Sequence, residues 1–189
     1  MKCADAQLAL TAEHGFSNWH SFGQIVRGQA LALLGKADEA IAEIKGALDG
    51  LAATGAVIPG WVYAILALSY LAAKQPGEGL AIAAKGLGTA DHANDAYLYR
   101  FQGELLLMSD SANAADAETS FRAAIATASK QSAKYAELCA TSSLARLLAE
   151  QGRHDEARTM LAEIYNWFTE GFDTADLKDA KALLDELAA

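Results

Sequence analysis

Seven aromatic and polar residues recur at related places along this chain and could together recognise another molecule. Three rings, Phe22, Trp61 and Tyr97, follow one another at intervals of 39 and 36 residues. The polar residues that accompany them in the same register are Gln29, Arg100, Glu104 and Arg146. Aromatic anchors beside a few charges are typical of surfaces that bind peptides. The alternative is that the rings pack between adjacent helices as part of the core.

The sequence contains no recognisable catalytic or metal-binding constellation. Gly35-Lys36 is followed by Ala37, so the Gly-Lys-Ser/Thr ending of a phosphate-binding loop is absent. The four histidines pair neither with one another nor with a cysteine at the spacing of metal ligands. Ser142-Ser143 falls in a predicted helix, without the strand and turn that expose a nucleophile. We therefore predict no catalytic residue, metal or cofactor, with an unrecognised all-α enzyme as the alternative.

Composition predicts an all-α protein that must position these residues on helices. The chain has 189 residues, of which 52% are hydrophobic and only two are proline. Alanine and leucine predominate and favour helix, whereas the β-branched and aromatic runs of strands are almost absent. The length suits one domain.

The net charge and the cysteines indicate which partners the protein can bind and in which compartment it is located. The net charge of −9 without a basic cluster argues against nucleic acid as a partner. Cys3 and Cys139 stand alone, which favours a reducing, cytoplasmic location with both thiols as small apolar fillers. The longest apolar run, Val62 to Leu68, is too short to cross a membrane, which needs about 20 residues.

A period of about 39 residues organises the chain. Four segments carry a small residue at the same place: Ala40, Gly79, Ala117 and Ala157. Four residues later each has an apolar residue: Ile44, Ala83, Phe121 and Leu161. A small residue also lies in the helix predicted before each segment: Gly28, Ala67, Gly103 and Ala145. Small residues allow two helices to approach closely, so each pair is predicted to be a helical hairpin.

These features resemble the tetratricopeptide repeat. The best matches are Gly28 with Gly35-Lys-Ala-Asp-Glu-Ala40, and Gln151-Gly-Arg-His-Asp-Glu-Ala157. The resemblance implies a right-handed α-solenoid of stacked hairpins whose first helices line one face. Because the period exceeds the usual ~34 residues of this family, we expect long helices in every hairpin.

We predict one helical-repeat domain over residues 1–189, with atypical ends. Its parts are the second helix of an incomplete repeat (1–15), hairpins over 17–55, 57–91, 94–131 and 133–171, and a capping helix (173–189). An incomplete first repeat leaves an apolar face exposed, so we expect either a preceding segment or a homodimer through the N-terminal helix to cover it. Trp167, Phe168 and Phe172 are predicted to fill the joint between the last hairpin and the cap; the alternative is an aromatic ligand cage.

The whole chain also resembles a more specific family. The stretches AEHGFSNWHSFGQIVRGQALALLGKADEAI, YRFQGELLLMS and YNWFTEGFDTADLKDAKALLDEL are similar to the C-terminal region of bacterial adenylate/guanylate cyclases that combine a cyclase domain, a P-loop ATPase domain and tetratricopeptide repeats. The resemblance implies a non-catalytic module for protein interaction or signal sensing, whose partner is a protein, a peptide or the upstream cyclase and ATPase domains. The alternative context is an ATPase-type transcriptional regulator.

Overall fold

The computed structural model describes residues 1–188, and these residues form helices joined by short turns, with no strand among them. They divide into two compact units, one over residues 1–94 and one from Asp95 onward. The predicted all-α class is confirmed. The interpretation of the chain as one domain, with the hairpin ranges given above, stays a prediction, and residue 189 of the predicted cap lies outside the described residues.

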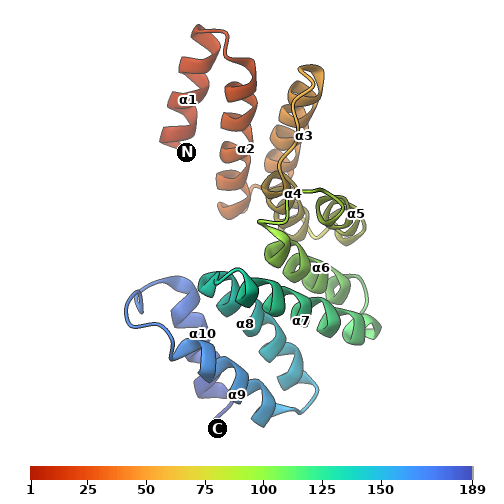
Figure 1. The fold of residues 1–189 in the computed structure, drawn as a ribbon, viewed down its shortest axis with the longest axis vertical. Helices are drawn as coiled ribbons and strands as arrows, with labels where there is room; N and C mark the ends of the chain where they lie inside the picture. The colour runs from red at the N-terminus through yellow and green to blue at the C-terminus, as the bar shows by residue number, and fades with distance from the viewer. Residues whose placement is uncertain (189) are drawn as a thin grey trace. The chain divides into compact units, whose positions relative to one another are not determined.

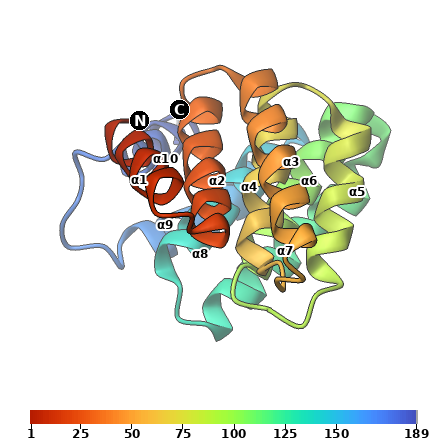
Figure 2. The same ribbon diagram turned by 90° about the horizontal axis from the view of Figure 1, so that it is seen from above.

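Unit 1 contains a single helix followed by two hairpins (Figures 1 and 2). Its helices are α1 (Lys2–Glu13), α2 (Ser17–Leu33), α3 (Ala37–Ala53), α4 (Gly60–Ala72) and α5 (Pro76–Leu87). Helix α2 contacts α1, α3 and α4, so it is shared between neighbouring layers. This sharing is typical of a repeat stack.

Unit 2 contains two hairpins and a final helix. Its elements are α6 (Asp95–Ser109), the short 3-10 helix η1 (Ser111–Asn113), α7 (Ala114–Lys130), α8 (Lys134–Glu150), α9 (His154–Tyr165) and α10 (Ala175–Glu186). Helix α8 contacts α6 and α7, and α10 contacts α8 and α9 in the same way. Helix α10 therefore takes the place that the first helix of a further repeat would have.

The small residues predicted at helix crossings are confirmed. A Cβ atom added to Gly28 would lie 2.5 Å from Ile44, and one added to Gly103 would lie 2.5 Å from Phe121. The alanines on the opposite helices, Ala40 and Ala117, are completely buried. The repeat period therefore reflects the points at which the helices of each hairpin come closest.

Three helices are shorter than the sequence analysis predicted. Helices α2 and α3 have 17 residues each, but α4 has 13, and α5 and α9 have 12 each. In the second hairpin, proline marks where both helices begin, because Pro59 stands just before α4 and Pro76 is the first residue of α5. The expectation of long helices in every hairpin is wrong, and the remaining residues of that period form the connections 54–59 and 88–94.

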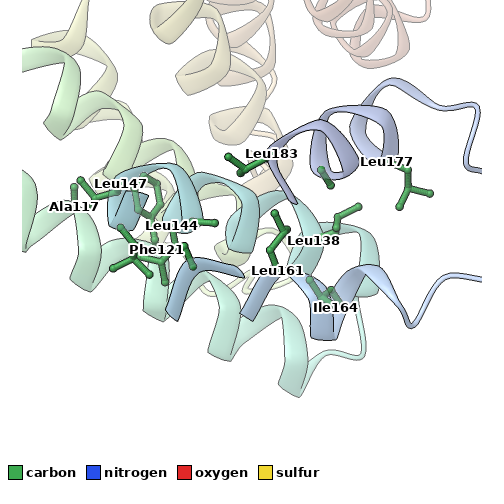
Figure 3. Packing of buried hydrophobic residues seen from close by; sticks show 13 residues of the cluster. Ala117, Phe121, Leu138, Leu144, Leu147, Leu161, Ile164, Leu177 and Leu183 are labelled. Atoms are coloured by element: carbon green, nitrogen blue, oxygen red, sulfur yellow. The ribbon is translucent and has the colours of Figure 1, made fainter. Parts of the chain in front are cut away.

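The core of unit 2 joins both hairpins to α10 (Figure 3). Phe121 from α7, Leu144 from α8 and Leu161 from α9 are buried at its centre. Leu177 and Leu183 from α10 extend this cluster, with Phe168 packed at its edge. The predicted role of α10 as a helix that covers the last hairpin is confirmed by these contacts.

A ring of four ion pairs connects α7 to α9 and the turn before it. Arg122 binds Glu118 and Glu156 at 2.7 and 2.8 Å, and Arg153 binds the same two carboxylates at 2.8 and 2.7 Å. The hydrogen bond from Arg153 lowers the pKa of Glu118 below its usual value of 4.5, outweighing burial, and the bond from Arg122 adds to this effect. The ring therefore stabilises unit 2 when Glu118 is ionised.

Replacing Glu118 with glutamine should lower the free energy of unfolding at pH 7 by up to about 1 kcal/mol. Because folding lowers the pKa of Glu118, the stabilisation by its ion pairs is fully present above its usual pKa of 4.5. It disappears as the pH falls through the lower pKa that Glu118 has in the folded state. Urea unfolding at pH 7, 5 and 3 should show the difference between wild type and Glu118→Gln shrinking with acidity. Glu163→Gln, at an exposed site on α9, is the control. A difference that stays constant down to pH 3 would contradict this role of Glu118.

Candidate functional site

Eight polar residues of unit 2 gather on one face, formed by α6, α8 and α10, which we call the α6–α8–α10 face. A pocket of about 140 Å³ lies on this face. Its polar lining residues are Arg100, Glu104, Cys139, Ser142, Ser143, Arg146, Asp176 and Asp179. Three of the predicted site residues, Arg100, Glu104 and Arg146, therefore come together. The fourth in this unit, Tyr97, lies one turn before Arg100 on α6 and is partly buried.

A hydrogen-bonded cluster connects α6 to α8 in this pocket. The Arg100 Nε–H group donates to Glu104 Oε1 at 2.9 Å, and the Ser143 hydroxyl donates to the same oxygen at 2.8 Å. Burial by itself would lower the pKa of Arg100, but the charge and hydrogen bond of Glu104 outweigh it and raise that pKa. Arg100 and Glu104 are thus held as a fixed charged pair beside the open part of the pocket.

A second cluster connects α8 to α10. The Tyr135 hydroxyl donates to Asp176 Oδ2 at 2.8 Å, and the Cys139 sulfur lies 3.9 Å from Asp176 Oδ1. Burial raises the pKa of the Cys139 thiol, and partial burial together with the bond to Asp176 raises the pKa of Tyr135. Both groups are therefore neutral at pH 7, and Cys139 lacks the thiolate character of a nucleophile.

Arg146 differs from Arg100, the other arginine of this pocket, because its side chain is exposed and its charge is available. Its side chain is exposed at the edge of the pocket, on the same face as Asp179 of α10. Within residues 1–188, its guanidinium group has no hydrogen bond or ion pair. An exposed guanidinium beside a fixed polar cluster can bind a carboxylate through two parallel hydrogen bonds.

The remaining predicted site residues belong to unit 1. The Phe22 and Trp61 rings lie 5.8 Å apart, and both are partly buried against the core of that unit. Gln29 lies further along α2 and is also partly exposed. Each ring thus contributes to the packing between α2 and α4 and still keeps an accessible edge.

Sequence reasoning missed Tyr135, Ser143 and Asp176. Tyr135 lies one turn before Cys139 on α8, and half of its surface is exposed. The aromatic register falls on Cys139 in this helix, so it passed over the Tyr135 ring, although an aromatic residue one turn away was a usable signal. Asp176 lies in the first turn of α10, where the sequence alone explains it as a charge that is favourable for the helix.

The aromatic residues before α10 do not all fill the joint that was predicted for them. Phe168 packs against the core, but Trp167 is 57% exposed and Phe172 is 45% exposed. Trp167 instead lines a larger pocket of about 490 Å³ between α7, α8 and α9, where Lys134 Nζ lies 5.9 Å from its ring centroid. The prediction is therefore wrong for Trp167, whereas the Phe172 ring lies 5.7 Å from the Tyr165 ring at the end of α9 and leaves nearly half of its surface exposed.

The two cysteines also differ from each other. Cys139 is buried as predicted, but Cys3 is exposed, so its assignment as an apolar filler is wrong. Helix α1 packs mainly through Ala4 and Thr11, which turns Cys3 away from α2.

No helix in the described part of the chain has the length and apolar character to span a membrane. Over the same residues, no group of three or more His, Cys, Asp and Glu side chains is arranged to hold a metal ion.

Comparison with known families places the chain in a broad class. The sequence model of the tetratricopeptide repeat matches residues 22–44 and residues 140–163. These segments cover most of the α2–α3 and α8–α9 hairpins, one in each unit. No curated protein matches this chain. These two segments therefore match tetratricopeptide repeats, and within each unit the helices pack in sequence as in a helical solenoid of this type.

Proposed function

We propose that this chain is a non-catalytic protein-interaction module that binds an extended peptide segment of its partner on the α6–α8–α10 face. Tetratricopeptide repeats generally mediate contacts between proteins. The observation that carries the proposal is the exposed, unpaired guanidinium of Arg146 beside the fixed Arg100–Glu104–Ser143 cluster. A partner carboxylate would pair with Arg146, and a partner basic group would face Asp179.

The exposed ring of Tyr135 supplies the apolar part of this surface. It is held in place by its hydrogen bond to Asp176, so little side-chain entropy would be lost when a partner packs on it. Tyr97 adds a second partly exposed ring on α6. Aromatic anchors with a few charges provide both affinity and direction for a bound peptide.

We further propose that this module serves a bacterial adenylate/guanylate cyclase signalling protein and is cytoplasmic. The resemblance of its sequence to the repeat region of such proteins supports this context. In that setting the bound segment comes from the cyclase or ATPase domain or from a separate signalling partner. A cyclase coding sequence in the same reading frame before Met1 would support the proposal, and an unrelated upstream gene with its own stop codon would contradict it.

Selection from a displayed peptide library tests the binding face. We expect the selected peptides to share an acidic residue, and Arg146→Glu should weaken their binding at least about tenfold, measured by fluorescence anisotropy. Arg158→Glu is the matched control, because Arg158 is also exposed but lies on α9. Peptides that bind both variants equally well would place the recognition surface elsewhere.

A further inference from the structure

The pocket that Trp167 lines lies between α7, α8 and α9, and we call it the α7–α9 pocket. Its volume of about 490 Å³ falls within the range of roughly 300 to 1,000 Å³ that small-molecule sites occupy. One face of each helix forms its walls, with residues taken from 122–129, 134–141 and 160–167. None of the lining residues belongs to the pocket on the α6–α8–α10 face. The α7–α9 pocket is therefore a separate candidate site.

A buried hydroxyl group without a hydrogen-bond partner lies in the wall of this pocket. Three other buried hydroxyls, those of Thr11, Ser69 and Ser120, each donate to the carbonyl four residues earlier in their helix. The Thr141 hydroxyl makes neither this bond nor any other with residues 1–188, although Thr141 is only 3% exposed. Its oxygen keeps access to the pocket rather than being sealed in the core. A buried polar group of this kind is satisfied when a ligand supplies the missing bond.

Four charged side chains line the pocket, and three of them are already paired. Arg122 belongs to the ring of ion pairs between α7 and α9, and Lys134 Nζ lies 2.7 Å from Glu137 Oε2. Glu163 is exposed on α9 and forms no ion pair or hydrogen bond with the described residues. The charge that remains available to a ligand is therefore a carboxylate, which favours an ammonium group.

The rest of the lining suits an aromatic ring. Trp167 follows Glu163 by one helical turn and is 57% exposed, so an accessible indole stands beside the available carboxylate. Ile125, Met160 and Ile164 supply the apolar part of the walls and pack against the core of unit 2. Apolar walls with a few convergent polar groups are typical of small-molecule sites, and an indole attracts both rings and cations.

We propose that the α7–α9 pocket binds a small arylalkylamine that carries a phenolic hydroxyl group. Its ammonium group pairs with Glu163, its ring packs against Trp167 and the apolar walls, and its hydroxyl completes the hydrogen bonding of Thr141. Tyramine is a simple probe with all three features. This site does not depend on the proposed peptide-binding face, so either proposal can fail without the other.

Calorimetry with tyramine and two analogues tests the chemistry of the ligand. Tyramine should bind the full chain with a dissociation constant of about 1 mM or lower. Phenethylamine, which lacks the hydroxyl, should bind about fivefold more weakly. The acid 3-(4-hydroxyphenyl)propionate, which replaces the ammonium with a carboxylate, should not bind at about 10 mM. No binding of tyramine, or equal binding of the acid and the amine, would overturn the proposal.

Two variants test the residues. Thr141→Val removes only the hydroxyl, so it should unfold like wild type, weaken tyramine about fivefold and leave phenethylamine unchanged. Glu163→Gln should weaken both amines about tenfold. Glu150→Gln is the matched control, because Glu150 is also exposed but lies at the far end of α8 from Lys134. Normal tyramine binding by Thr141→Val, or equal effects of the two glutamine variants, would overturn the proposal.

Discussion

Replacing Gly103 with valine should lower the free energy of unfolding of unit 2 by about 3 kcal/mol, since overpacking a crossing point forces the two helices apart. A Cβ atom at this position would lie 2.5 Å from Phe121 Cε1, and the two further methyl groups of valine would add to the clash. The Phe121 ring is 1% exposed and belongs to the unit 2 core, so it has no free space into which to turn.

Urea unfolding and hydrogen exchange of the α6 and α7 amides measure this loss. Gly46→Val is the matched control, because Gly46 also lies inside a helix but has no atom within 4 Å of an added Cβ. It should change stability by no more than about 0.5 kcal/mol, since valine and glycine differ little in helix propensity. Adding Phe121→Leu to Gly103→Val should restore part of the stability by making space. Equal losses for the two valine variants would mean that the crossing is not tightly packed.

The crossings were predictable from sequence because a helix repeats its faces regularly. Once Gly28 and Gly103 were aligned with Ala40 and Ala117, the close approach of each helix pair followed from helical geometry. The turn after α2 was equally predictable: Gly35 has φ of +77°, and the Lys36 N–H group donates to the Leu31 carbonyl at 2.9 Å. Such a turn stops a helix and favours glycine.

The candidate site was predictable only in part. Arg100, Glu104 and Arg146 were found by extending the repeat register, and they share the α6–α8–α10 face. Ser143 and Tyr135 were not predicted, because their hydrogen-bond partners depend on the directions in which the side chains of neighbouring helices point. The repeat period of the sequence does not give these directions. The exposed position of Trp167 was not predicted for a different reason: this residue follows the last helix of a hairpin, where the loop rather than the helix sets its position.

Replacing Leu183 with aspartate should release α10 from unit 2 and lower its free energy of unfolding by about 4 kcal/mol, because a buried leucine is lost and an unpaired carboxylate is placed in the core. Leu183 is 7% exposed and belongs to the same cluster as Leu138 and Leu161. The loss of stability cannot exceed the free energy that the packing of α10 contributes to unit 2, because the helix can detach as a whole. Limited proteolysis in the connection 169–174 and urea unfolding both measure the detachment.

Lys178→Asp is the control, because it introduces the same carboxylate on an exposed site of α10. The first turns of a helix favour negative charge, so this variant should unfold like wild type within about 0.5 kcal/mol. Leu183→Asp should also abolish peptide binding on the α6–α8–α10 face, although it leaves Arg146 unchanged, because Asp176 leaves with α10 and Tyr135 loses its partner. Normal peptide binding by Leu183→Asp, with α10 shown to be detached, would mean that α6 and α8 alone form the recognition surface.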